Sequence, residues 1–445
     1  MRLPLDRKWP PAAVWWPLIA GVFVLAFTVA TPPFQGPDEV GHFWRAYSLA
    51  RGSVLPKIEH GKPTVYLPRG VRDLVGTLWV ETAGKSGSDA KVGLDRIRAA
   101  AQLPLSRSEL VPVTIPAHYT PIPYFSQTLA CLIGDNLRLR PLATFYLGRL
   151  FNGAFALLLI TIGLRLARDP WPFASIAMLP MLLYLCGTYS PDATTAGLAF
   201  LVVALALRFD ADQQTQDSWW SFVGCSFLLA LCKPAYFLVP FIVVGRLKER
   251  RIVRIALLAA AVGVGVWISS ATAHRNFYAM RTDVPIGIAE QALNVRLAPF
   301  HFISIAAHDY RAHWYAYLDH FVGHLGWLDI QLPHQLIVCV LGLLLLIGLT
   351  TRRLPFRDRL VAVAIVVCSL TLISLSQYLA WTPIGGETIE GMQGRYLLPL
   401  GPLGILLLGI TDRWPRATTA IRAAFLLVSV MLNIVAVTLV IQRYY

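Results

Sequence analysis

The residues with the strongest chemical character follow the first apolar segment, in the run Pro37-Asp38-Glu39-Val-Gly-His42-Phe-Trp-Arg45. Two adjacent carboxylates with a histidine and an arginine form an acid–base set of the kind that takes a proton from a reacting group. Such charges at a membrane boundary are costly unless they are paired or used. A helix cap would need only one of the acids. We therefore predict that Asp38 and Glu39 are catalytic. His42 and Arg45 are expected to bind substrate.

A second polar group lies near the other end of the chain, in Gln393-Gly-Arg395-Tyr396. The planar guanidinium of Arg395 presents paired donors that match phosphate oxygens. The alternative is that Arg395 extends to lipid headgroups, with Tyr396 as an interfacial aromatic residue. Glu390 precedes this motif and is included as a substrate-binding candidate.

Four further residues carry polar side chains beside apolar segments. Lys233 is the only charged residue in 218–245, so it calls for an anion unless it extends to the membrane interface. Asp192 is a candidate for orienting a sugar hydroxyl, for pairing with Lys233, or for capping the helix that follows it. His118 and Tyr119 are candidates for lining an acceptor cleft, with ordinary interfacial residues as the alternative. We include all four as substrate-binding candidates.

Seven of the ten histidines fall within residues 273–334. The spacing of His320 and His324 would place two imidazoles on one helical face, as zinc sites require. This segment lacks the glutamate of an HExxH motif, and aromatic residues such as Trp314 are interleaved with the histidines. We therefore expect an amphipathic interfacial helix and no metal site. The six cysteines lie in apolar stretches without a CxxC pair, which supports neither a disulfide framework nor a cysteine zinc site.

The elements that must position these residues are membrane helices. Hydrophobic residues make up 56% of the chain, charged residues only 14%, and the mean hydropathy is +0.56. The net charge of +14 comes from short basic runs between apolar segments, so nucleic acid is not an expected partner. We predict about eleven spans. They fall near residues 9–37, 142–164, 172–189, 192–208, 218–232, 234–246, 255–272, 335–350, 360–381, 396–411 and 419–441.

The basic runs also set the orientation. Runs that include Lys248, Arg353 and Arg413 should face the cytoplasm, and so should the N-terminus with Arg2 and Lys8. This orientation requires the short apolar segment 119–134, which contains two prolines, to lie at the outer interface instead of spanning. Long outer loops at 32–140 and 273–334 then carry the candidate residues, with Ser86 in the first of them. The first apolar segment is expected to remain as an uncleaved helix.

Seven segments spread over nearly the whole chain resemble the bacterial multi-pass membrane family known as domain of unknown function 2142. They are PPFQGPDEVGHFWRAYSLARG (32–52), YTPIPYFSQ (119–127), LGRLFN (147–152), YSPDA (189–193), LCKPAY (231–236), GHLGWLD (323–329) and WTPIGGETIEGMQGRYLLPL (381–400). The family is similar in layout to GT-C glycosyltransferases, which use a polyprenyl-phosphate-linked sugar on the outer face of the membrane. Asp38-Glu39 resembles the Asp-Glu motif of protein O-mannosyltransferases, in which the leading Asp is catalytic. Gly41 adds one residue before His42.

The resemblance implies an all-α, GT-C-like membrane fold whose first outer loop carries juxtamembrane helices. One part would be a transmembrane module at 1–272, and the other, at 273–445, an outer loop with the C-terminal helices. Phosphate binding by Arg395 and Tyr396 is favoured on the same ground.

The implied function is transfer of a sugar from a polyprenyl-phosphate donor to a cell-envelope glycan or lipid acceptor, on the periplasmic or external face of a bacterial plasma (inner) membrane. Fixed cations can stabilise the leaving phosphate, so no cofactor is expected, although the sequence leaves a divalent metal open. Membrane lipids are the other expected partners. The alternatives are a transporter or flippase, or a polymerase-associated protein, for lipid-linked polysaccharide.

Overall fold

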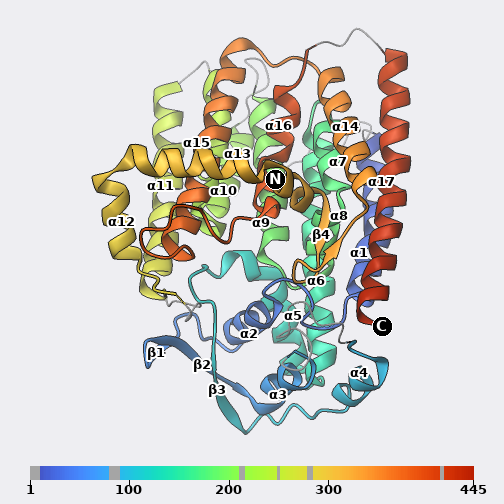
Figure 1. Ribbon diagram of the computed structural model, residues 1–445, viewed down its shortest axis with the longest axis vertical. Helices are drawn as coiled ribbons and strands as arrows, with labels where there is room; N and C mark the ends of the chain where they lie inside the picture. The colour runs from blue at the N-terminus through green and yellow to red at the C-terminus, as the bar shows by residue number, and fades with distance from the viewer. Residues whose placement is uncertain (1–10, 80–90, 210–215, 248–250, 278–283, 411–414) are drawn as a thin grey trace.

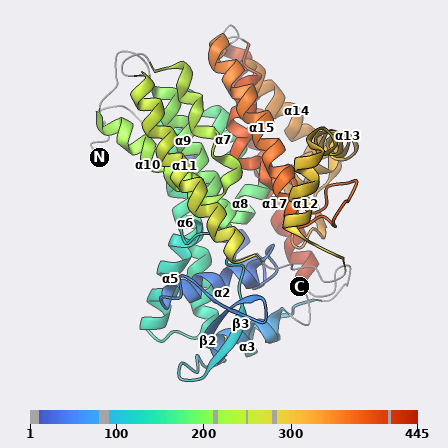
Figure 2. The ribbon, with the colours of Figure 1, turned by 90° about the vertical axis from the view of Figure 1, so that its left-hand side faces the viewer.

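The computed structural model describes residues 11–79, 91–209, 216–247, 251–277, 284–410 and 415–445. A bundle of long helices forms one end of the molecule, and a smaller part with a β-sheet and short helices covers the other end (Figures 1 and 2). The orientation predictions made at Arg2, Lys8, Ser86, Lys248 and Arg413 lie outside the described residues.

Six helices within the described ranges are long and apolar enough to cross a membrane. They are α1 (Pro11–Ala30), α6 (Pro141–Leu166), α9 (Pro191–Arg208), α11 (Arg251–Arg275), α15 (Phe356–Ala380) and α17 (Pro415–Tyr444). Shorter apolar helices lie beside them, among them α10 (Gln216–Cys232) and α14 (His334–Thr350). The prediction of a helical multi-pass membrane protein is confirmed, whereas the count of eleven spans is not.

Three of the predicted spans are interrupted. The segment 172–189 divides into α7 (Trp171–Ala177) and α8 (Pro180–Gly187), 234–246 forms the 3₁₀ helices η2 (Pro234–Tyr236) and η3 (Val239–Gly245), and 396–411 divides into η4 (Gly394–Leu400) and α16 (Gly401–Leu407). Proline lies at or next to each break, at Pro180, Pro240 and Pro402. Proline has no amide hydrogen and its ring clashes with the preceding turn, so it starts a helix more readily than it continues one.

The part that covers one end of the bundle was predicted as helical and also contains a small sheet. Its elements are α2 (Glu39–Ala50), β1 (Lys57–Glu59), β2 (Lys62–Pro68), α3 (Arg69–Leu78), α4 (Leu94–Ala100), β3 (Leu110–Thr114), η1 (Ile122–Tyr124) and α5 (Phe125–Asn136). The strands are antiparallel in the order β1-β2-β3, with Val65 opposite Val113. The β-branched residues of β2 and β3 favour this extended pairing, a local signal that the helical reading of the loop overlooked.

The segment 119–134, predicted to lie at the interface, forms η1 and α5. The 12 residues of α5 rise about 18 Å, which is less than the roughly 30 Å of a hydrocarbon core. Asp135 fixes the end of α5, because its carboxylate accepts hydrogen bonds from the Tyr47 hydroxyl, Arg51 and Arg107. The segment packs beside α2 and α6. Its place at the outer interface of the membrane stays a prediction.

Basic segments meet at the end of the bundle away from the sheet. Arg246, after η3, lies 2.8 Å from Asp358 near the start of α15, and Arg422 of α17 lies 3.5 Å from Asp169 before α7. The connection from α14 to α15, which carries Arg353, lies at the same end (Figure 1). The segments that carry Arg246 and Arg353 therefore lie at one end of the bundle, as the predicted orientation requires. Which side of the membrane that end meets stays a prediction.

The segment 273–334 contains α12 (Ile288–Leu297), α13 (Pro299–Gly323) and a short hairpin of β4 (His324–Leu325) and β5 (Ile330–Gln331). Helix α13 lies across the long helices instead of along them (Figure 1). Helices from the two predicted parts of the chain pack together, α1 with α17 and α9 with η4. The division at residue 272 stays a prediction.

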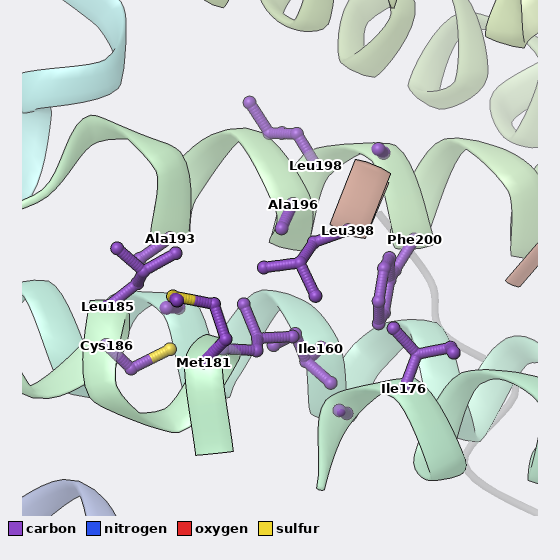
Figure 3. Packing of buried hydrophobic residues seen from close by; sticks show 14 of the residues in the cluster. Ile160, Ile176, Met181, Leu185, Cys186, Ala193, Ala196, Leu198, Phe200 and Leu398 are labelled. Carbon is purple, nitrogen blue, oxygen red and sulfur yellow. The ribbon is translucent and has the colours of Figure 1, made fainter. Parts of the chain in front are cut away.

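Apolar side chains fill the centre of the bundle between α6, α7, α8, α9 and η4. Leu398 packs there with residues such as Ile160, Ile176, Met181 and Phe200 (Figure 3). Leu398 is 1% exposed. This core fixes the ends of α9 and η4 relative to each other, and both ends carry candidate residues.

Candidate functional site

The loop between α1 and α2 is held by side chains from distant elements. Arg149 of α6 donates hydrogen bonds to the carbonyl oxygens of Thr28, Thr31 and Pro32. The Trp327 indole donates to the Phe34 carbonyl at 3.1 Å, and the Tyr184 hydroxyl donates to the Gln35 carbonyl at 3.0 Å. The backbone just before Asp38 is therefore placed by three separate parts of the fold.

Glu39 faces the interior and forms a buried ion pair with Arg149. Arg149 Nε donates to Glu39 Oε1 at 2.9 Å and Arg149 Nη2 donates to Glu39 Oε2 at 2.7 Å, and both side chains are 0% exposed. Two backbone amides, of Tyr189 and Gly36, donate to the same carboxylate at 2.7 and 3.0 Å. A Cβ at Gly36 would lie 2.8 Å from the Glu39 side chain, so glycine is needed there.

This environment changes the role predicted for Glu39. Four donors already satisfy its two oxygens, two of them from the bidentate guanidinium of Arg149. The carboxylate has no free lone pair directed at a substrate. In the structure Glu39 therefore holds the loop before α2. The catalytic role expected for Asp38 and Glu39 stays a prediction.

Asp38 faces the opposite way and is accessible. Its side chain is 56% exposed and its Oδ2 lies 3.0 Å from Arg395 Nη2 of η4. The residue precedes α2 in the left-handed region, with φ 60° and ψ 13°. A non-glycine residue there is uncommon and costs on the order of 1–3 kcal/mol, and aspartate is among the residue types that tolerate it. The pinned loop holds Asp38 in this conformation.

Arg395, Asp192 and Lys233 form a cluster with Asp38. Lys233 Nζ lies 2.5 Å from Asp192 Oδ1, and Arg395 Nε lies 3.8 Å from Asp192 Oδ2. The cap of α9 is Ser190, whose hydroxyl accepts from the Asp192 amide. The structure thus pairs Asp192 with Lys233 and gives the cap to another residue. Arg395 Nε is buried and has no hydrogen-bond partner.

Aromatic rings surround the cations. Lys233 Nζ lies 5.5 Å from the centre of the Tyr119 ring and 5.0 Å from that of Tyr396, both within cation–π range. The His118 ring packs on Tyr119 at 4.2 Å between centroids. The Tyr236 hydroxyl donates to the Tyr396 carbonyl at 2.8 Å, which fixes the segment next to Arg395.

His42 lies beneath the cluster on α2. Its Nδ1 is 2.8 Å from the Tyr124 hydroxyl, and the residue is 6% exposed. Burial lowers the pKa of His42 to about 4, against the opposing effect of Asp38. Burial likewise lowers the pKa of His118 to about 4. Both imidazoles are therefore neutral at pH 7, so the positive charge of the site comes from Lys233 and Arg395.

The remaining two predicted residues have other surroundings. Arg45 is 1% exposed and donates to the carbonyl oxygens of Val54 and Tyr119 at 3.1 and 3.5 Å. It therefore holds the backbone next to the Tyr119 ring. Glu390 lies in the loop before η4, where its backbone amide donates to the Thr382 hydroxyl.

Eight of the eleven predicted residues thus meet in one place, from five segments of the chain. They are Asp38, His42, His118, Tyr119, Asp192, Lys233, Arg395 and Tyr396.

Sequence reasoning missed three residues that support this arrangement. Arg149 is a charge inside a predicted span, a position that should have raised the question of its partner. Tyr124 and Tyr236 lie in segments that carried the family resemblance, but nothing in their spacing pointed to His42 or Tyr396.

Comparisons with known proteins give one family and one distant structure. A family model described as "Predicted membrane protein (DUF2142)" matches residues 22–404. The search of curated proteins returned no match. Among solved structures, ArnT from Cupriavidus metallidurans in the apo state aligns with 96% of this chain and 78% of its own, at 12% identity and a TM-score of 0.35. A similarity this low carries no argument about the site.

Proposed function

We propose that this chain, which belongs to the DUF2142 family of predicted membrane proteins, is a glycosyltransferase that uses a polyprenyl-phosphate-linked sugar. One observation carries the proposal: the exposed carboxylate of Asp38 is held in a strained conformation against Arg395, in a cluster that includes Lys233. Strained residues in over-determined surroundings gather at functional sites. A base beside fixed cations suits transfer from a phosphate leaving group.

The cations are suited to a lipid phosphate. Arg395 and Lys233 balance the charges of Asp38 and Asp192, so the cluster has no net charge while both imidazoles are neutral. Arg395 Nε faces Asp192 at 3.8 Å without a hydrogen bond, and it is a donor that a phosphate oxygen would satisfy. When a phosphate engages this guanidinium, it competes with Asp38 for Nη2. Donor binding thereby frees the Asp38 carboxylate.

The freed carboxylate acts as general base. Asp38 takes the proton from the acceptor hydroxyl while the hydroxyl oxygen bonds to the anomeric carbon of the sugar. The bond from that carbon to the phosphate oxygen breaks, and polyprenyl phosphate leaves with the electron pair. Arg395 and Lys233 stabilise the charge that develops on the leaving phosphate. The rings of Tyr119 and Tyr396 and the neutral His118 offer apolar faces and hydrogen-bonding edges to the sugars.

The proposed setting is the periplasmic or external face of a bacterial plasma membrane, with a cell-envelope glycan or lipid as acceptor. Helices long enough to span and the family's description as a membrane protein support the membrane location. The site lies at the end of the bundle that the sheet covers, opposite the basic loops, which supports the external side.

The test is an assay of the parent protein in proteoliposomes. A polyprenyl-phosphate donor with a labelled sugar is supplied with a cell-envelope lipid extract as the source of acceptors, and two products are followed: free polyprenyl phosphate and labelled acceptor. We expect both to appear together, and both to be lost in Arg395→Ala. If the donor instead crosses the bilayer with its sugar bond intact, the protein is a carrier and the proposal is wrong.

A further inference from the structure

A second group of polar side chains lies where α13 meets the β4–β5 hairpin. Asp319 and His320 are adjacent near the end of α13, and His324 begins β4. One ligand atom from each of the three residues lies within 4.8 Å of the others. The Asp319 side chain is 4% exposed and that of His324 is 17% exposed. The group shares no residue with the site around Asp38.

Two of its polar atoms are buried without a hydrogen-bond partner. They are Asp319 Oδ1 and His320 Nδ1. A buried polar atom left unpaired costs on the order of 1–3 kcal/mol, and most such atoms in folded proteins are satisfied. His324 is fully engaged, because its Nδ1 lies 2.7 Å from Asp319 Oδ2 and its Nε2 lies 3.2 Å from the Leu328 carbonyl oxygen. The group therefore combines an oriented histidine with two free ligand atoms.

We propose that Asp319, His320 and His324 bind one divalent transition-metal ion, of which Zn²⁺ is the representative. Two imidazole nitrogens and one carboxylate oxygen are ligands that zinc prefers, whereas Mg²⁺ and Ca²⁺ require oxygen ligands. Bonds of about 2.0–2.2 Å would place the ligand atoms roughly 3.4 Å apart, so the side chains close by little more than 1 Å on binding. His324 exchanges one of its two hydrogen bonds for the metal.

The sequence alone favoured the opposite reading of this segment, because His320 and His324 lack an HExxH glutamate. Asp319, which directly precedes His320, supplies the third ligand in place of that glutamate. Adjacent residues on a helix do not point the same way, so spacing could not identify it. The hairpin turns the chain after Gly323 and returns His324 to Asp319.

The metal would brace the segment that carries Arg395. A Cβ on Gly394 would lie 1.9 Å from the Tyr317 carbonyl oxygen and 2.5 Å from the Phe321 amide, so η4 begins in direct contact with the last turns of α13. Holding α13 against the hairpin therefore holds the surface on which Gly394 rests. Three protein ligands leave one position for water or a further ligand. The inference is independent of glycosyl transfer.

Metal retention tests the proposal. Parent protein in detergent is stripped with a chelator, equilibrated with Zn²⁺, desalted, and assayed by elemental analysis, with Mg²⁺ run in parallel. We expect about one Zn²⁺ per chain and no retained Mg²⁺. Asp319→Asn and His320→Ala should each weaken retention by about tenfold or more. His308→Ala, which removes an exposed imidazole from the same helix, should retain the parental amount.

Spectroscopy keeps the test decisive if a variant folds poorly. Co²⁺ loaded into the parent should give the visible absorption of a low-coordinate site with nitrogen ligands, and Zn²⁺ should displace it. The proposal is overturned if the parent retains no Zn²⁺ and shows no such spectrum. It is equally overturned if Asp319→Asn, monodisperse and folded, retains as much Zn²⁺ as the parent.

Discussion

Two neighbouring carboxylates of this protein enter two very different ion pairs. Glu39 and Arg149 are both 0% exposed, and every oxygen of Glu39 is satisfied by the guanidinium or by backbone amides. Asp38 is 56% exposed and meets Arg395, a cation whose Nε still makes no hydrogen bond. The first pair is saturated, whereas the second can take a further ligand.

The difference in burial between Glu39 and Asp38 assigns the first to the stability of the fold and the second to function. A buried pair contributes through what its loss would leave behind, an uncompensated charge in a low-dielectric interior. A pair with one member open to solvent, as Asp38 is, contributes less to folding, and that member can give up its partner to a ligand. Adjacent residues of one motif therefore divide two tasks: Glu39 holds the loop, and Asp38 is presented by it.

The largest expected effect is loss of the fold when the saturated pair is broken. Arg149→Leu leaves Glu39 buried without a cation and three carbonyls without a donor, and should cost about 3–5 kcal/mol. The thermal unfolding midpoint and the folded yield in detergent measure it. Arg140→Leu, an exposed position at the start of the same helix, should cost about 1 kcal/mol or less. Equal midpoints for the two variants would contradict the contrast.

Conservative changes in the two acids sharpen the comparison. Glu39→Gln leaves the buried Arg149 cation without its anion and should destabilise by about 3 kcal/mol, the lower end of the cost of breaking a buried pair. Asp38→Asn should stay within about 1 kcal/mol of the parent, because Asp38 itself is more than half exposed, Asp192 still faces Arg395, and asparagine also tolerates the left-handed conformation. Unfolding midpoints measured side by side test the order. An Asp38→Asn protein less stable than Glu39→Gln would reverse our assignment.

The role of the Asp38–Arg395 pair should show in the affinity for the sugar donor. Arg395→Lys keeps the charge but loses the fork, and should weaken binding of a polyprenyl-phosphate sugar by about tenfold while folding is perturbed less. Arg395→Ala should be worse, and Arg353→Lys at the opposite end should bind normally. Binding to the detergent-solubilised protein is the measurement. If both Arg395 variants bind like the parent, Lys233 becomes the leading phosphate ligand.

The smallest expected effect concerns pH. The pKa of His42 is lowered from 6.5 to about 4 by burial, so the unfolded chain takes up its proton first as pH falls. The contribution of neutral His42 to the free energy of unfolding is fully present above pH 6.5. It is lost as pH drops toward 4, and the loss is about 1 kcal/mol at pH 5.5. His42→Gln should show a correspondingly shallower loss of unfolding midpoint between pH 7.5 and 5.5. A change at the exposed His308 should leave the slope unaltered. An identical slope in His42→Gln would remove this histidine from the account.

Much of this arrangement was readable from the sequence because charges beside apolar segments are conspicuous. Asp38, Asp192, Lys233 and Arg395 each stood out at the end of a predicted span, and the orientation argument put them on one face. Their contacts were not readable, since each depends on how helices far apart in sequence pack.

The separation of Asp38 from Glu39 was hidden for the same reason. It depends on Arg149, 110 residues along the chain from Glu39, and on an amide of Tyr189 beyond it. The breaks at Pro180 and Pro402 carried a local signal, but apolar composition outweighed it when the spans were assigned. Asp319 carried no signal at all, because a hairpin brings its partner to it.

The most direct test of the central claim is sugar transfer per folded molecule by Asp38→Asn in proteoliposomes. A positioned base typically contributes about 10²–10⁴ in rate, so this variant should lose most of its turnover while its donor binding and unfolding midpoint stay close to those of the parent. An Asp38→Asn protein that is folded and transfers sugar at the parental rate would remove Asp38 from the mechanism. It would also contradict the proposal that the Asp38–Arg395 pair serves function.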